Sequence, residues 1–154
     1  ARVVDGLGYR YYWATEGLRE EYRNYDPGGG NRIAYDVLKH IHGLSGTIAN
    51  ASLGLPNIRP TQEEPLSWEE IRKETLQNLK KTSDILKQSS SSDVSDSKIT
   101  FQRGENVTEF EYWHILNGPL SDAIYHVGQI TSYRRSSGNP IDSRVNVFTG
   151  KTRE

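Results

Sequence analysis

The 154-residue sequence contains no cysteine and no methionine. Without cysteine the chain has no disulfide, no thiolate-bound zinc or iron–sulfur site and no thiol nucleophile. Any metal site must therefore use the four histidines and the carboxylates. The absence of methionine indicates that Ala1 is not an initiator residue, so we expect a chain that has been processed or trimmed.

The sequence also lacks an excess of charge of either sign. Nineteen Lys and Arg residues stand against twenty Asp and Glu residues, a formal net charge of −1. Proteins that bind nucleic acids usually carry a basic excess that neutralises phosphates, so we expect no nucleic-acid partner. No apolar stretch approaches the roughly 20 residues that a membrane span needs. We expect one domain in the cytoplasm, although a removed export signal would leave no trace.

Four segments have apolar residues at the three- and four-residue spacing of amphipathic helices. They cover residues 5–22, residues 32–51, residues 67–87 and the stretch from Pro119 to just before Ser137. The third segment opens on Ser67 with Glu70 three positions later, which is the pattern of a capping box. These helices predict an all-α protein.

The connections between the helices differ in composition. Residues 88–97 are rich in serine and predict a mobile linker. Apolar residues on both sides of residues 103–106 predict a short β-hairpin before the last helix. The connection after the second helix contains Pro56 and Pro60, and both it and the next are long enough to allow crossovers. We therefore predict a four-helix bundle with long crossover connections.

The end of the last predicted helix divides the chain into two parts. Residues 1–137 are expected to form the four-helix bundle, and residues 138–154 an extended tail. Val145, Val147 and Phe148 are the apolar residues of the tail, and we expect them to pack back on the bundle.

The second and fourth predicted helices carry the residues best suited to chemistry. Asp122 and His126 are four residues apart, so both side chains leave one helix face. His40 lies at the border of the apolar face of the second helix. If these two helices pack together, two imidazoles and one carboxylate meet, a set that catalytic metals use with open positions.

The same residues have an ordinary structural interpretation. An Asp–His pair at this spacing is most often a solvated hydrogen bond, and a histidine beside an apolar stripe is often a satisfied structural residue. Spacing alone therefore leaves the metal site as one of two alternatives.

A resemblance to a known family bears on this choice. DAIYHVGQ at residues 122–129, followed by SYRR at residues 132–135, resembles the fourth-helix signature of the DinB-like (YfiT-like) superfamily of metalloenzymes. VLKHIHGLS at residues 37–45 is similar to the helix that supplies that family's first metal ligand. The resemblance implies a four-helix bundle that holds a divalent metal through three side chains, two of them from the fourth helix.

Carried over residue by residue, the resemblance assigns metal-ligand roles to His40 and His126. Asp122 stands where the family usually has a further histidine, and a carboxylate binds the same ions. The departure fits a retuned site as well as a lost one. Nickel, zinc, iron and manganese all suit two imidazoles and a carboxylate.

Two functions follow from the resemblance. The first is a divalent-metal-dependent hydrolase or thiol/group transferase that acts on a small molecule, with a homodimer as its assembly. The second is a non-catalytic dimeric binding module on the same fold, because a fold does not by itself define an activity.

Further residues are candidates for secondary roles. Gln129 follows His126 by three residues and is expected to hydrogen-bond to it outside the metal-ligand set. Tyr12 on the first helix and His114 before the fourth are candidates for the pocket wall, with ordinary packing as the alternative. Arg134 and Arg135, in the last turn of the fourth helix, could attract an anionic substrate, but compensation of the helix dipole explains both adequately.

Overall fold

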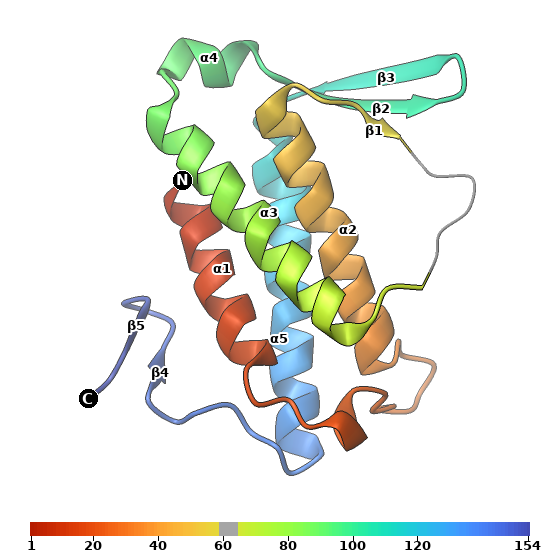
Figure 1. The fold of residues 1–154 in the computed structure, drawn as a ribbon, viewed down its shortest axis with the longest axis vertical. Coiled ribbons are helices and arrows are strands. Elements are labelled where there is room, and N and C mark those ends of the chain that lie inside the picture. The colour runs from red at the N-terminus through yellow and green to blue at the C-terminus, as the bar shows by residue number, and fades with distance from the viewer. Residues whose placement is uncertain (59–64) are drawn as a thin grey trace.

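A computed structural model describes residues 1–58 and 65–154, and its main feature is the predicted four-helix bundle (Figure 1). The four long helices are α1 (Arg2–Thr15), α2 (Ala34–Leu53), α3 (Trp68–Gln88) and α5 (Ser121–Ser136). Helix α2 packs against α3 and α5, and α1 packs against the same two helices. Helices α2 and α3 run in the same direction, so the connection between them crosses the length of the bundle as predicted.

The ends of the long helices follow from local sequence. The capping box at the start of α3 is present, with the Ser67 hydroxyl accepting from the Glu70 N–H and the Glu70 carboxylate accepting from the Ser67 N–H. Helix α2 ends at Gly54, whose φ of 67° is left-handed and favours glycine. Helix α1 stops at Thr15, earlier than the predicted residue 22, and the short 3-10 helix η1 (Glu20–Tyr22) follows it.

The serine-rich segment is a helix, so the prediction of a linker there was wrong. Helix α4 (Ser91–Asp96) is capped by Ser90, whose hydroxyl accepts from the N–H of Asp93 while the Asp93 carboxylate accepts from the N–H of Ser90. Serine-rich composition suggested a linker, yet serine and aspartate at this spacing are also the residues that start a helix.

The predicted β-hairpin is present at the end of the bundle where α2 finishes. Strands β2 (Lys98–Arg103) and β3 (Asn106–Glu111) pair antiparallel, and β1 (Asn57–Ile58) adds in parallel to β2. The predicted proline-containing connection continues through residues 59–64, which lie outside the described residues. After β3, the π-helical turn η2 (Leu116–Leu120), which contains Pro119, leads into α5.

The C-terminal tail forms a small hairpin beside α1. Strands β4 (Val145–Asn146) and β5 (Lys151–Thr152) pair antiparallel. The Arg10 guanidinium donates to the carbonyl oxygen of Val147 at 3.1 Å, which ties this hairpin to α1. Phe148 is 96% exposed, so the expectation that it packs on the bundle was wrong.

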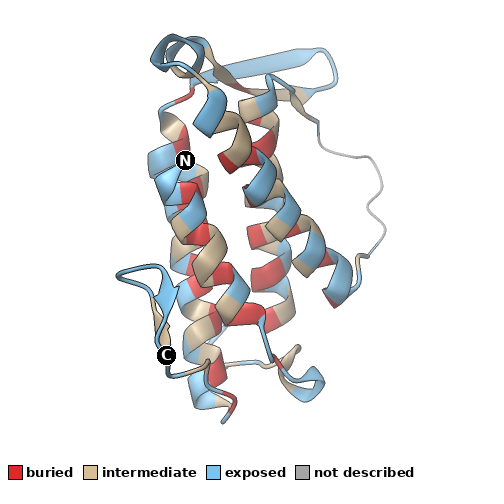
Figure 2. Cartoon of the chain, turned by 60° about the vertical axis from the view of Figure 1, so that its left-hand side comes forward, coloured by how far each residue is buried: buried red, intermediate tan, exposed pale blue. Residues whose placement is uncertain are grey.

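The core lies between the four long helices, where each presents its apolar stripe to the others (Figure 2). The largest fully buried apolar side chains are Leu7, Tyr11, Val37, Leu38, Ile41, Ile48, Ile71 and Ile130. In the described part of the chain, no helix combines the length and the apolar character needed to cross a membrane.

Candidate metal centre

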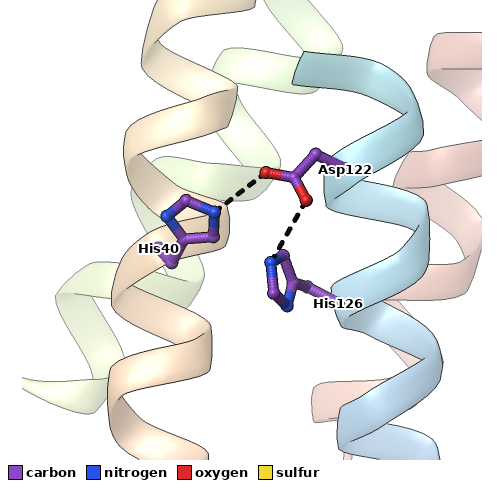
Figure 3. A group of neighbouring side chains, drawn as sticks. All are labelled: His40, Asp122 and His126. Carbon is purple, nitrogen blue, oxygen red and sulfur yellow. Dashed lines mark hydrogen bonds and ion pairs between the residues drawn. The ribbon is translucent and has the colours of Figure 1, made fainter. Parts of the chain in front are cut away.

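The packing of α2 on α5 brings the three predicted ligands together. His40 comes from the middle of α2, and Asp122 and His126 come from the first two turns of α5 (Figure 3). One ligand atom from each residue lies within 4.8 Å of the others. Because 82 residues separate His40 from Asp122, this grouping depends on the tertiary fold.

Asp122 is the centre of the cluster, since each of its carboxylate oxygens faces one imidazole. Oδ2 lies 2.9 Å from His40 Nε2, and Oδ1 lies 3.2 Å from His126 Nε2. The two imidazole rings stand edge to face with centroids 4.6 Å apart. Both N–O distances are those of hydrogen bonds. Ligand atoms bound to one ion at about 2.1 Å are about 3.0–3.4 Å apart, so the three side chains, whose ligand atoms lie within 4.8 Å of one another, would have to move slightly to share a cation.

Gln129 sets the orientation of His126, as the sequence predicted. Its Oε1 lies 2.6 Å from His126 Nδ1. An amide oxygen only accepts, so Nδ1 carries the proton and the neutral imidazole keeps its lone pair on Nε2. That lone pair points at a carboxylate oxygen of Asp122, an arrangement that a proton or a metal ion between them would stabilise.

The cluster is buried on one side and open on the other. The His126 side chain is only 10% exposed, whereas the Asp122 side chain is 42% exposed. His40 is intermediate between them, with 34% of its side chain exposed. Protein atoms therefore hold the inner imidazole rigidly, and solvent has access to the outer side, which suits an ion with open coordination positions.

The other sequence candidates lie elsewhere. His114 stacks on Trp113 with ring centroids 3.8 Å apart, and Tyr12 packs edge-on against Trp13 beneath the Arg72 guanidinium. Neither belongs to the described metal-ligand cluster, so both fit the packing alternative. His42 points away from the cluster and contacts Glu74 of α3 at 2.9 Å.

Sequence reasoning missed Tyr125. Its ring centroid lies 5.2 Å from that of His126, and the residue is 64% exposed. Its hydroxyl accepts a long hydrogen bond, 3.5 Å, from Gln129 Nε2. The only signal in the sequence was its position immediately before His126, where it stands at the edge of the apolar face.

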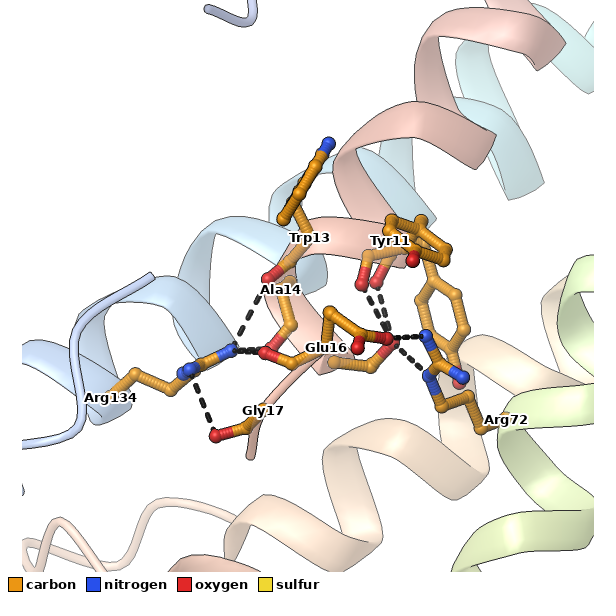
Figure 4. A network of polar contacts seen from close by, with 9 residues as sticks. Tyr11, Trp13, Ala14, Glu16, Gly17, Arg72 and Arg134 are labelled. Carbon is orange, nitrogen blue, oxygen red and sulfur yellow. Dashed lines mark hydrogen bonds and ion pairs between the residues drawn. The ribbon is translucent and has the colours of Figure 1, made fainter. Parts of the chain in front are cut away.

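Arg134 was a substrate-binding candidate, and the structure excludes that role because the residue is 3% exposed. Figure 4 shows its guanidinium directed at the backbone where α1 ends. Its guanidinium donates to carbonyl oxygens at the end of α1 and beyond α5, among them Glu16 at 2.6 Å and Asn139 at 2.7 Å. Burial lowers the pKa of Arg134 from its ordinary value. Its function is to hold the end of α1 against α5.

The arrangement of the helices has a match among solved structures. The crystal structure of YjoA, a DinB-like protein from Bacillus subtilis, aligns with a TM-score of 0.63 and 20% sequence identity, over 90% of this chain and 93% of that one. No protein-family model and no curated protein sequence matches the chain. At this identity the likeness establishes the fold alone. The chain therefore has the fold of the DinB-like proteins, as the motifs on its second and last long helices indicated.

Proposed function

We propose that this protein is a divalent-metal-dependent enzyme, a hydrolase or a thiol/group transferase, whose metal is held by His40, Asp122 and His126. The observation that carries the proposal is the convergence of two imidazole nitrogens on the two oxygens of one carboxylate, on a surface open to solvent. Two nitrogens and one oxygen leave positions for water and a small substrate.

Each residue has a definite part in this proposal. His40 and His126 would supply neutral nitrogen ligands from two different helices, and Asp122 would supply the negative charge. Gln129 would keep the proton of His126 on Nδ1, so that Nε2 is free to bind. A bound divalent metal lowers the pKa of a coordinated water or thiol and polarises an acceptor group. Nickel, zinc, iron and manganese all suit this donor set.

The test is metal content and metal-dependent stability. Protein purified without a histidine tag should bind one divalent ion on titration, and thermal stability should rise with metal and fall with a chelator. His126→Ala should abolish both effects. His42→Ala is the matched control. His42 lies on α2, as His40 does, and also contacts a carboxylate, but that carboxylate is Glu74, outside the cluster. Metal content below about a tenth of an equivalent, with no binding on titration, would refute the metal site.

The alternative is a non-catalytic dimeric module that uses the same fold. It is favoured by Asp122, which departs from the histidine expected at its position. Metal binding without turnover of any ester, amide or thiol-transfer substrate would favour this alternative. Turnover that depends on added metal and is lost in His126→Ala would favour the enzyme.

A further inference from the structure

A groove runs along the outer face of α2 and meets the candidate metal centre at His40. We call it the α2 groove; its floor is Gly43, Gly46 and Thr47, and its roof is the face of the sheet that carries Phe101 and Arg103. Its volume is about 620 Å³. This is within the range of small-molecule sites, and the candidate metal ligand His40 is part of its lining.

The floor of the groove is open because two glycines replace side chains on one stretch of helix. A Cβ atom built on Gly43 or on Gly46 would meet no atom within 4 Å. Glycine weakens a helix interior by about 1 kcal/mol relative to alanine, so two in four residues are unfavourable for α2 itself. Their effect is to let a ligand lie directly against the helix backbone.

The roof combines an aromatic ring with a positive charge. Phe101 and Arg103 are two residues apart on β2, so both point to the same face of the sheet. Phe101 is partly buried and packs edge-on against Phe110 with centroids 6.1 Å apart. An aromatic body placed in the groove would thus contact Phe101, with the guanidinium of Arg103 one side chain further along the strand.

The groove is locally positive in a chain whose net charge is −1. Among the described residues that line it, three are cationic, Arg32, Lys39 and Arg103, and one is acidic, Asp36. Arg32, just before α2, and Asp36, in the first turn of α2, lie at the same end of the groove. Arg103 lies at the other end, and among the described residues its guanidinium has no hydrogen-bond or ion-pair partner.

We propose that the α2 groove binds a small amphipathic anion, with its apolar or aromatic body between Gly46 and Phe101 and its carboxylate or phosphoryl group on Arg103. The proposal rests on the proposed function, because it places the other end of this molecule toward the metal at His40. It names the substrate class as anionic. A planar guanidinium pairs with either kind of anion in two parallel hydrogen bonds.

The experiment measures ligand binding by metal-free protein, followed through the backbone amide resonances of Gly43 and Gly46. The probes are phenyl phosphate, benzoate and neutral phenol. Both anions should bind more tightly than phenol. The tighter-binding anion shows whether the group that pairs with Arg103 is a phosphoryl group or a carboxylate. Arg103→Gln should weaken the anions about tenfold and leave phenol unchanged.

Two controls separate this effect from general ones. Lys98→Gln makes the same charge change on the same strand, but Lys98 lies on the opposite face and contacts Glu111, so anion binding should stay at the wild-type value. Gly46→Leu should block all three probes, whereas Gly8→Leu on α1, where a Cβ also meets open space, should block none.

The outcomes distinguish this proposal from the metal proposal. Equal binding of phenol and the anions, or equal losses in Arg103→Gln and Lys98→Gln, would overturn the anionic substrate class even if the protein binds metal. Anion binding that depends on Arg103 in a protein that takes up no metal would support the anion site and refute the metal centre alone.

Discussion

A polar cluster lies at each end of α5, facing a neighbouring helix. The two clusters differ in what their polar atoms contact. Near the end of α5, the buried guanidinium of Arg134 donates to carbonyl oxygens of α1 and of the chain after α5. Near its start, the carboxylate of Asp122 lies between the imidazoles of His40 and His126, with one oxygen facing each ring. The first cluster is complete by itself, whereas the second is the cluster that we propose holds a cation.

The comparison shows how to tell a structural polar residue from a functional one. Arg134 is buried, and its donors are used by backbone carbonyls that a helix end leaves without partners. In the candidate metal centre His40 and Asp122 are partly exposed, and the buried imidazole of His126 is oriented by Gln129 rather than by the backbone. Hydrogen bonds to backbone carbonyls fix a fold, and side-chain oxygens converging at an open surface offer a binding site.

The largest effect is expected from Arg134→Met. The substitution keeps the length of the buried side chain and removes all donors to the carbonyl oxygens at the end of α1. We expect the free energy of unfolding, measured by urea denaturation, to fall by about 3–5 kcal/mol. Arg135→Met, an exposed neighbour, should change it by less than about 0.5 kcal/mol. Equal small effects from both would contradict the structural role of Arg134.

The contrast between these two arginines also marks the limit of sequence reasoning. Apolar spacing predicted all four long helices, and the Ser67 capping box was correct to the residue because caps are local chemistry. The grouping of His40 with Asp122 and His126 was also predicted, since helical spacing and the family motif place each on a known face. Arg134 continues the buried stripe of Val127 and Ile130 on α5, whereas the adjacent Arg135 does not. A basic residue on that stripe gave no reason to expect burial, because the carbonyl oxygens that accept from Arg134 come from α1 and from the chain after α5.

Other features depend on tertiary contacts that leave no local pattern. The α2 groove requires a roof from β2, which is about 50 residues from α2 along the chain. The sequence alone therefore gave no reason to connect Gly43 and Gly46 with a binding site.

Helix α4 was missed for another reason. Its composition is that of a linker, and the Ser90–Asp93 cap was the signal that outweighed it.

The second effect in size concerns the other end of α5. Asp122→Asn keeps the shape of the side chain but removes the charge that would attract a cation. We expect metal affinity, measured by titration calorimetry, to fall by about a hundredfold, with little change in the stability of metal-free protein. Asp142→Asn, a carboxylate on the tail that pairs with Arg144, is the control for charge and should leave affinity unchanged. Undiminished affinity in Asp122→Asn would remove Asp122 from the ligand set.

A smaller effect is expected at Gln129, which contacts His126 and none of the other candidate ligands. Gln129→Leu frees Nδ1 of His126, so the imidazole loses its preferred tautomer and orientation. Metal affinity should fall by about tenfold, and raising the metal concentration should restore full occupancy. Gln77→Leu on α3 serves as the control. A complete loss of binding would instead make Gln129 a direct ligand.

The smallest effect is expected at Tyr11, a buried residue. It tests whether a polar atom without a partner indicates function only where the surface is open to solvent. Among the described residues, the buried Tyr11 hydroxyl has no well-formed hydrogen bond. Burial raises the pKa of Tyr11 to about 12, and the nearby Thr75 side chain offsets only part of that rise. The Tyr11 hydroxyl faces the core and not solvent, so we assign it no binding role. Tyr11→Phe should therefore stabilise the protein at neutral pH by about 1 kcal/mol, as measured by urea denaturation.

The pH dependence of the free energy of unfolding of Tyr11→Phe tests whether burial of the hydroxyl is the cause. The folded-state pKa of Tyr11 lies above its ordinary value of 10.0, so the folded state favours the neutral phenol. The stability that this preference for the neutral phenol contributes is complete below about pH 10 and is lost as the pH rises through about 12. Tyr11→Phe should lose less stability than wild type across this interval. A curve for Tyr11→Phe that matches wild type across this interval would show that the folded-state pKa of Tyr11 is not raised.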